Sequence, residues 1–125
     1  MSDVEILREI MHTGGASWNL AGQLLHPTSG YIVADGNSEE VYPVGDRTQI
    51  EEVQIAAALQ HYTRNYWNRV VVADGALFFG AWMSVTNLFL DLSEHIMDRA
   101  EAVQVGRKRG ELSIYECETG KVLYI

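Results

Sequence analysis

The chain has 125 residues, of which 47% are apolar, and its 9 basic and 17 acidic side chains give a net charge of −8. This length suits one domain, the apolar fraction is too high for a disordered or low-complexity protein, and the single cysteine, Cys117, excludes a disulfide scaffold. The negative charge argues against generic binding to nucleic-acid phosphates or to anionic membranes, because both require a cationic surface.

The acidic side chains are concentrated in the first half of the chain. Residues 1–60 hold nine acids and two bases, whereas residues 61–125 hold eight acids and seven bases. Asp3, Glu5 and Glu9 stand where a signal peptide would carry bases before an apolar run, and no segment approaches the roughly 18 apolar residues that span a bilayer. We therefore expect a protein that acts inside the cell and has no membrane partner.

The first third of the chain predicts a short helix followed by short strands. Residues 2–11 place apolar side chains on one helical face, and residues 1–13 are expected to form an N-terminal helical arm. The pair Asp35-Gly36 tolerates positive φ and predicts a hairpin turn. Pro43 cannot donate to a ladder and marks an edge strand. Strands are predicted at residues 16–25, 31–33 and 41–44.

The rest of the chain predicts two helices and several strands. From Ile55 to Tyr66, apolar and aromatic side chains recur at spacings of four, three and four, which predicts a long helix over residues 47–66. A second helix is predicted to begin near Asp98, a favourable N-cap residue, and to end at Arg109. Further strands are predicted at residues 69–73, 76–85, 88–92, 111–117 and 121–125.

These elements predict one α+β domain over residues 1–125. We expect a curved, mainly antiparallel sheet of about six strands, with one long helix and one or two shorter helices. The short turns between the predicted strands favour antiparallel pairing, because a parallel pair needs a crossover of a dozen residues or more.

Three segments carry a family resemblance and together cover about half the chain. They are GGASWNLAGQLLHPTSGYIVA (residues 14–34), GAWMSVTNLFLDLSEHIMDRAEAV (residues 80–103) and ELSIYECETGKVL (residues 111–123). They resemble a group of small uncharacterised proteins of phages and mobile elements, including phages of actinobacteria. The chain departs from that group at residues 83–87, where a shorter glycine-containing turn is typical. The resemblance implies an accessory factor in the cytoplasm of a bacterial host cell, and it transfers no catalytic residue.

Motifs that would indicate a reaction are missing. The sequence has no phosphate-binding glycine loop, no zinc-protease histidine pair and no nucleophile elbow, and one cysteine cannot form a thiolate zinc site. Asp91, His95 and Asp98 would share one face of a helix and could then bind a divalent metal or act in acid–base catalysis. A structural alternative is that Asp91 points outward from a strand and Asp98 caps a helix. We expect no catalytic residue and no cofactor, with these three residues as the alternative metal site.

An acidic and aromatic surface is the main candidate binding site. Such a surface suits a basic protein partner through charge complementarity. It does not suit single-stranded nucleic acid, which needs cations beside the stacking rings. The acidic members are Asp35, Glu39, Glu40, Asp46, Glu51 and Glu52, and the aromatic anchors are Trp18, Tyr66 and Trp67.

The leading hypothesis for function is a small acidic protein-interaction module, an accessory factor that binds and modulates a host protein. One alternative is a small enzyme or metal-binding protein that uses the aspartate and histidine residues named above. Another is a small-ligand-binding domain, with a pocket between the sheet and the long helix that is lined by Tyr62, Phe78 and Trp82. The edge near Pro43 or the C-terminal hairpin could also pair with a second copy of the chain.

Overall fold

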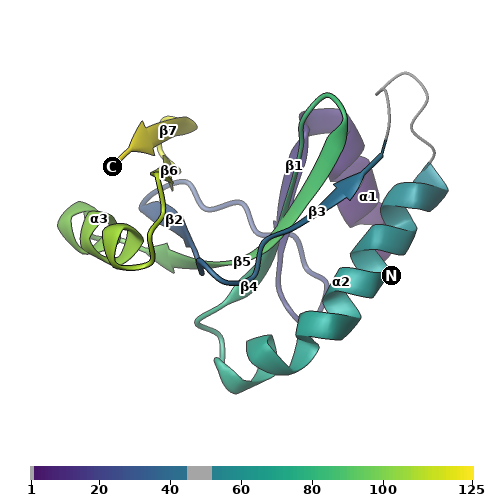
Figure 1. Cartoon of the computed structure of the whole chain (residues 1–125), viewed down its shortest axis with the longest axis horizontal. Helices are drawn as coiled ribbons and strands as arrows, with labels where there is room; N and C mark the ends of the chain where they lie inside the picture. The colour runs from purple at the N-terminus through teal and green to yellow at the C-terminus, as the bar shows by residue number, and fades with distance from the viewer. Residues whose placement is uncertain (1, 45–51) are drawn as a thin grey trace.

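The structure is a computed structural model that describes residues 2–44 and 52–125. Over these residues it has three helices and one open, antiparallel sheet of seven strands (Figure 1), which confirms the predicted α+β class with one strand more than expected. None of the helices in this part of the chain has the length and apolar character needed to cross a membrane. In chain order the elements are α1 (Ser2–Thr13), β1 (Gly15–Trp18), β2 (Tyr31–Ala34), β3 (Glu40–Pro43), α2 (Glu52–Val72), β4 (Phe78–Met83), β5 (Asn87–Ile96), α3 (Arg99–Lys108), β6 (Ser113–Glu116) and β7 (Lys121–Tyr124).

The sheet is organised around β5, which is ten residues long. One edge of β5 pairs with β4, where Ala81 lies opposite Leu90. The other edge pairs with two strands in succession, because β2 lies opposite residues 93–96 and β3 lies opposite residues 87–90. The strand order is therefore β1-β4-β5-β2-β6-β7, with β3 also beside β5.

The hairpin predicted at Asp35-Gly36 is wrong. β2 and β3 are each antiparallel to β5, so they run in the same direction and cannot pair as a hairpin. Between them, residues 35–39 form an excursion opposite only Asp91 and Leu92 of β5. Gly36 has the positive φ expected of a turn, 92°, but the long edge of β5 accommodates both strands and decides where the chain continues.

All three helices pack on the same face of the sheet. By strand alternation, Leu88, Leu90 and Leu92 point to this face, and each is fully buried. α1 and α2 cover the end that includes β1 and β4, whereas α3 packs on β2 and β6 through Ala102 and Ile114. Figure 1 shows α2 and α3 at opposite ends of the twisted sheet.

The helix α1 is part of the core and does not project as an arm. Ile10 is fully buried and Ile6 is 3% exposed, and both join the cluster that contains Trp18 and Phe79. A helix of 12 residues is marginal in isolation, so burial of its apolar face against β1 and β4 is what stabilises it.

The strand predicted at residues 69–73 is also wrong, because α2 continues through this segment. A run of β-branched residues favours a strand, but Val70 follows Tyr66 at a helical spacing of four and is only 2% exposed. Burial of Val70 therefore outweighs the small loss of helix propensity. The chain leaves the helix at Asp74 and Gly75, which have φ values of 49° and 90°.

The bounds of two other predicted strands, at residues 16–25 and 88–92, differ from the structure. The strand predicted at residues 16–25 is shortened to β1, and beyond it Leu24 makes an isolated bridge to Trp18. The first part of the predicted long helix, residues 47–51, lies outside the described residues. The strand predicted at residues 88–92 is longer than expected, because its pairing with β2 continues to Ile96.

The elements expected in the last quarter of the chain are confirmed. Asp98 is the N-cap of α3, and its carboxylate accepts a hydrogen bond from the backbone N–H of Glu101 at 2.9 Å. Gly110, with a φ of 77°, follows the end of this helix. β6 and β7 then pair as a hairpin in which Ile114 lies opposite Leu123.

We expect the substitution Ile10→Ala to lower the free energy of unfolding by about 2–5 kcal/mol, because it leaves a cavity at a fully buried position. Val4→Ala on the same helix is the matched control, since Val4 is 51% exposed and its truncation should change stability by less than about 0.5 kcal/mol. Urea unfolding measures both. Equally small effects would show that α1 does not contribute to the core.

Candidate functional site

The face of the sheet opposite the helices is the candidate functional site, and we call it the helix-free face. In the apolar clusters beneath α1, α2 and α3, the strand residues all belong to the face that packs against the helices. The helix-free face is formed by the alternate strand positions, which include Gly15, Ser17, Val41, Gly80, Trp82, Phe89 and Asp91.

An exposed aromatic stack lies at one end of this face. Trp82 of β4 and Phe89 of β5 are cross-strand partners, and their rings stack with centroids 4.1 Å apart and planes 5° apart. Val41 of β3 flanks the stack from the other side of Phe89. Trp82 is 47% exposed and Val41 is 46% exposed. Large apolar side chains exposed together on adjacent strands are typical of a binding surface.

The carboxylate of Asp91 lies on the same face, above Gly80. A Cβ atom at position 80 would be 2.7 Å from Asp91 Oδ1, so glycine leaves the space that this carboxylate occupies. The hydroxyl of Ser93 donates a hydrogen bond to the same oxygen at 3.1 Å. Burial raises the pKa of Asp91 to about 7, and the negative charges of Glu39 and Glu111 add to the rise. Asp91 therefore changes its charge near neutral pH.

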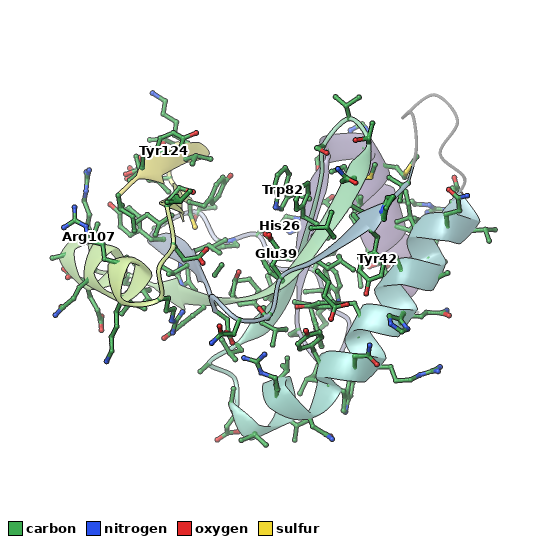
Figure 2. All side chains as sticks on the ribbon, in the orientation of Figure 1. His26, Glu39, Tyr42, Trp82, Arg107 and Tyr124 are labelled. Atoms are coloured by element: carbon green, nitrogen blue, oxygen red, sulfur yellow. The ribbon has the colours of Figure 1, made fainter. Side chains whose placement is uncertain are left out.

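Among the described strand positions of the helix-free face, Asp91 is the one carboxylate. None of these positions is Lys or Arg. Glu39 is exposed, and among the charged groups it has the largest effect on the pKa of Asp91. Arg107, from the basic end of α3, lies with Tyr124 at the other end of the molecule, away from Trp82 (Figure 2). A partner at the aromatic stack would therefore meet a negative field.

On the helix-free face, the end of the β4–β5 pair that carries Phe78 and Ser93 is closed. Phe78 and Ser93 belong to this face by alternation, yet they are 7% and 4% exposed. The connection from β1 to β2 reaches this end, where His95 Nε2 donates a hydrogen bond to the carbonyl oxygen of Ser29 at 2.7 Å. The Trp82 end of the β4–β5 pair is therefore open to a partner, and Tyr115, Val122 and Tyr124 of β6 and β7 are also exposed on this face.

Two members of the predicted acidic face are engaged within the protein. Asp35 forms an ion pair with Arg69 of α2, and the Asp35 side chain is only 12% exposed. Glu40 accepts a hydrogen bond from the Tyr42 hydroxyl at 2.7 Å, and burial together with this carboxylate raises the pKa of Tyr42 above its ordinary value. Figure 2 shows Tyr42 between β3 and α2. The ion pair of Asp35 holds the 35–43 segment against α2, and the hydrogen bond of Glu40 lies within β3.

The other members of the predicted acidic face are divided between two places. Glu39 lies beside the helix-free face, and Glu52 is exposed at the first residue of α2. Asp46 and Glu51 lie outside the described residues. Glu39 is therefore the described member of the predicted set that lies near Asp91 on the helix-free face.

The position of Glu39 depends on buried hydrogen bonds to its neighbour Ser38. The Ser38 hydroxyl accepts a hydrogen bond from the backbone N–H of Leu92 at 2.9 Å, and the Ser38 carbonyl accepts one from the Tyr62 hydroxyl at 2.8 Å. These bonds connect the excursion at residues 35–39 to β5 and to α2. They keep Glu39 close to Asp91.

The predicted aromatic anchors differ in exposure. Trp18 is 3% exposed and stacks on Phe79 in the core, with ring centroids 5.8 Å apart. Tyr66 stacks on the buried Tyr62 at 4.4 Å. Trp67 is 41% exposed on the helix side of the molecule, with its ring 6.5 Å from that of Phe79. Of the three predicted anchors, Trp67 alone is exposed.

The sequence pattern missed Trp82 as an anchor. Within the predicted strand 76–85, Trp82 has the opposite alternation to Phe79 and Ala81, which indicates that it faces away from their core. That signal is weakened because Phe78 has the same alternation as Trp82 and is nevertheless buried.

The alternative metal site is not assembled. β5 extends to Ile96, so the helical spacing that would group Asp91, His95 and Asp98 does not apply. Asp91 binds Ser93, His95 binds a backbone carbonyl and Asp98 caps α3. Over residues 2–44 and 52–125 no group of three or more His, Cys, Asp or Glu side chains is placed to hold a metal ion.

The predicted ligand pocket is also not formed by its three predicted residues. Tyr62 is fully buried on the helix side of the sheet, whereas Phe78 and Trp82 lie on the helix-free face. A cavity of about 260 Å³ is instead present among α1, β1 and α2. It is lined by Ile6, Trp18, Ala56, Leu59, Gln60, Thr63 and Arg64.

Comparisons with known proteins find no matching family model, no matching curated protein and no matching solved structure. The resemblance to proteins of phages and mobile elements therefore stays a prediction.

We expect Asp91→Asn to stabilise the protein at pH 8 and to have little effect at pH 4. In the folded state Asp91 keeps its proton up to about pH 7, whereas in the unfolded state it loses it near its ordinary pKa. At a pH between these two pKa values, unfolding releases a proton from Asp91. The free energy of unfolding therefore falls as the pH rises, by up to about 4 kcal/mol from Asp91 alone. Urea unfolding from pH 4 to pH 8 measures the slope.

The control for this experiment is Asp74→Asn, which makes the same chemical change at an exposed turn after α2. It should leave the pH dependence of the parent protein unaltered. If Asp91→Asn keeps that same pH dependence, the carboxylate of Asp91 titrates at its ordinary value.

Proposed function

We propose that this protein is a non-enzymatic interaction module that binds a basic segment of a partner protein at the Trp82 end of the helix-free face. The observation that carries the proposal is the exposed stack of Trp82 and Phe89 on a face whose described strand positions hold no cation. The polar side chains that could suggest a reaction, Asp91, His95 and Asp98, each form a hydrogen bond to a different partner within the protein.

Arginine is the partner residue that fits this surface best. A guanidinium group stacks on an exposed tryptophan ring, a contact worth about 0.5–2 kcal/mol. The carboxylate of Asp91 lies on the same face as the stack, two residues from Phe89, and Glu39 lies near Asp91, so these carboxylates can accept hydrogen bonds from the same partner segment. The net charge of −8 also increases the rate at which a cationic partner arrives.

The biological context of the proposal comes from the family resemblance. We propose an accessory factor of a phage or mobile element that acts in the cytoplasm of a bacterial host and modulates a basic host protein. Occupation of that protein's cationic surface by an acidic, aromatic face would compete with its normal anionic ligands.

We expect a short peptide of alternating Arg and Ser to bind the protein and a Gln/Ser peptide of the same length not to bind. Trp82→Ala should weaken binding of the arginine peptide by about tenfold, which corresponds to the loss of one cation–π contact of about 1.4 kcal/mol. Glu39→Gln should also weaken binding of the arginine peptide, and it should make that binding less dependent on salt. Calorimetric titration at low and high salt measures each affinity.

The matched controls lie on the helix side of the molecule. Trp67 has a similar exposed fraction to Trp82, and Glu52 is exposed like Glu39. Trp67→Ala and Glu52→Gln should leave peptide binding unchanged. Equal losses from Trp67→Ala and Trp82→Ala, or binding that is unaffected by both, would contradict the assignment of this face.

A further inference from the structure

A second potential binding site lies on the opposite side of the sheet, between α1 and α2. The cavity among α1, β1 and α2 has a volume of about 260 Å³. Figure 1 shows the two helices beside one another at this end of the sheet. The apolar wall is made by Ile6, Trp18 and Leu59, which are 3%, 3% and 7% exposed. The wall is therefore preformed by core residues.

The polar groups of the cavity all come from one side, the face of α2. Gln60, Thr63 and Arg64 follow one another at spacings of three and one, so they share one side of the helix. Arg69 and Arg109 are both in ion pairs, but Arg64 has no ion pair with any residue that the structure describes. In a protein with a net charge of −8, a cation at the edge of an apolar cavity without an acidic partner in the described chain is a group available to a ligand.

We infer that this cavity is a binding site for a small monocarboxylate with an apolar ring or branched chain. The apolar part would lie against Trp18 and Leu59, and the carboxylate would accept hydrogen bonds from the Arg64 guanidinium. Thr63 and Gln60 offer further polar contacts at the same edge.

The size of the cavity limits the ligand. An apolar protein cavity of about 150 Å³ binds benzene, so 260 Å³ accommodates one ring with a short acid side chain. Ordinary drug-sized ligands occupy about 300–1,000 Å³, which is larger than this site. The inference does not depend on the proposed partner-binding function, because the two sites share no residue.

The test uses phenylacetate and hexanoate as probes, with phenylacetamide and hexanamide as their neutral counterparts. Each acid should raise the thermal midpoint of the whole protein and shift the amide NMR signals of Leu59 and Thr63. Each acid should bind about tenfold more tightly than its amide, the factor expected for one charge-assisted hydrogen bond. Equal binding of acid and amide, or no binding of either, would overturn the inference.

Two substitutions test the residues. Arg64→Gln should remove the preference for the acid and leave the weaker binding of the amide, while Arg99→Gln, the same change on exposed α3, should alter neither. Ala56→Leu should fill the cavity and abolish binding of all four probes while keeping the thermal midpoint of the unliganded protein. An acid preference that survives Arg64→Gln, or probe binding that survives Ala56→Leu, would place the ligand elsewhere.

Discussion

The fold depends on one constraint, which is the burial of alternate side chains along the ten residues of β5. Leu88, Leu90 and Leu92 are all fully buried beneath the helices. A shift of one residue in the pairing of β5 would bring these leucines to the other face and would place Phe89 and Asp91 in the core. The register is therefore strongly specified, and the composition of the helix-free face follows from it.

The length of β5 also explains how acidic and aromatic side chains come together. Its edge accommodates β2 and β3 in succession, and the five residues between them form an excursion opposite only two residues of β5. Buried hydrogen bonds to Ser38 and the Asp35–Arg69 ion pair hold this excursion in place. Glu39 is thereby positioned near Asp91, which lies on the same face as the exposed stack of Trp82 and Phe89. This combination of an apolar stack and carboxylates supports the proposal of a basic partner.

The two proposed sites use opposite sides of one sheet. The helix-free face offers an exposed aromatic stack with the carboxylate of Asp91 on the same face, which suits a segment of a partner protein. The cavity between α1 and α2 is small, mostly apolar and edged by the cation Arg64, which suits a small acid.

The sequence by itself determined the features that depend on neighbours in the chain. The Asp98 cap, the end of α3 before Gly110 and the final hairpin are local hydrogen-bond and turn chemistry, and the structure has them as predicted. The antiparallel α+β class followed from periodicity and short turns. Only the tertiary structure decided that residues 69–72 are helical, that β2 and β3 share one edge of β5, and which carboxylates remain exposed. Each of these outcomes is set by burial against residues distant in sequence, which outweighs a local propensity worth less than about 1 kcal/mol per residue.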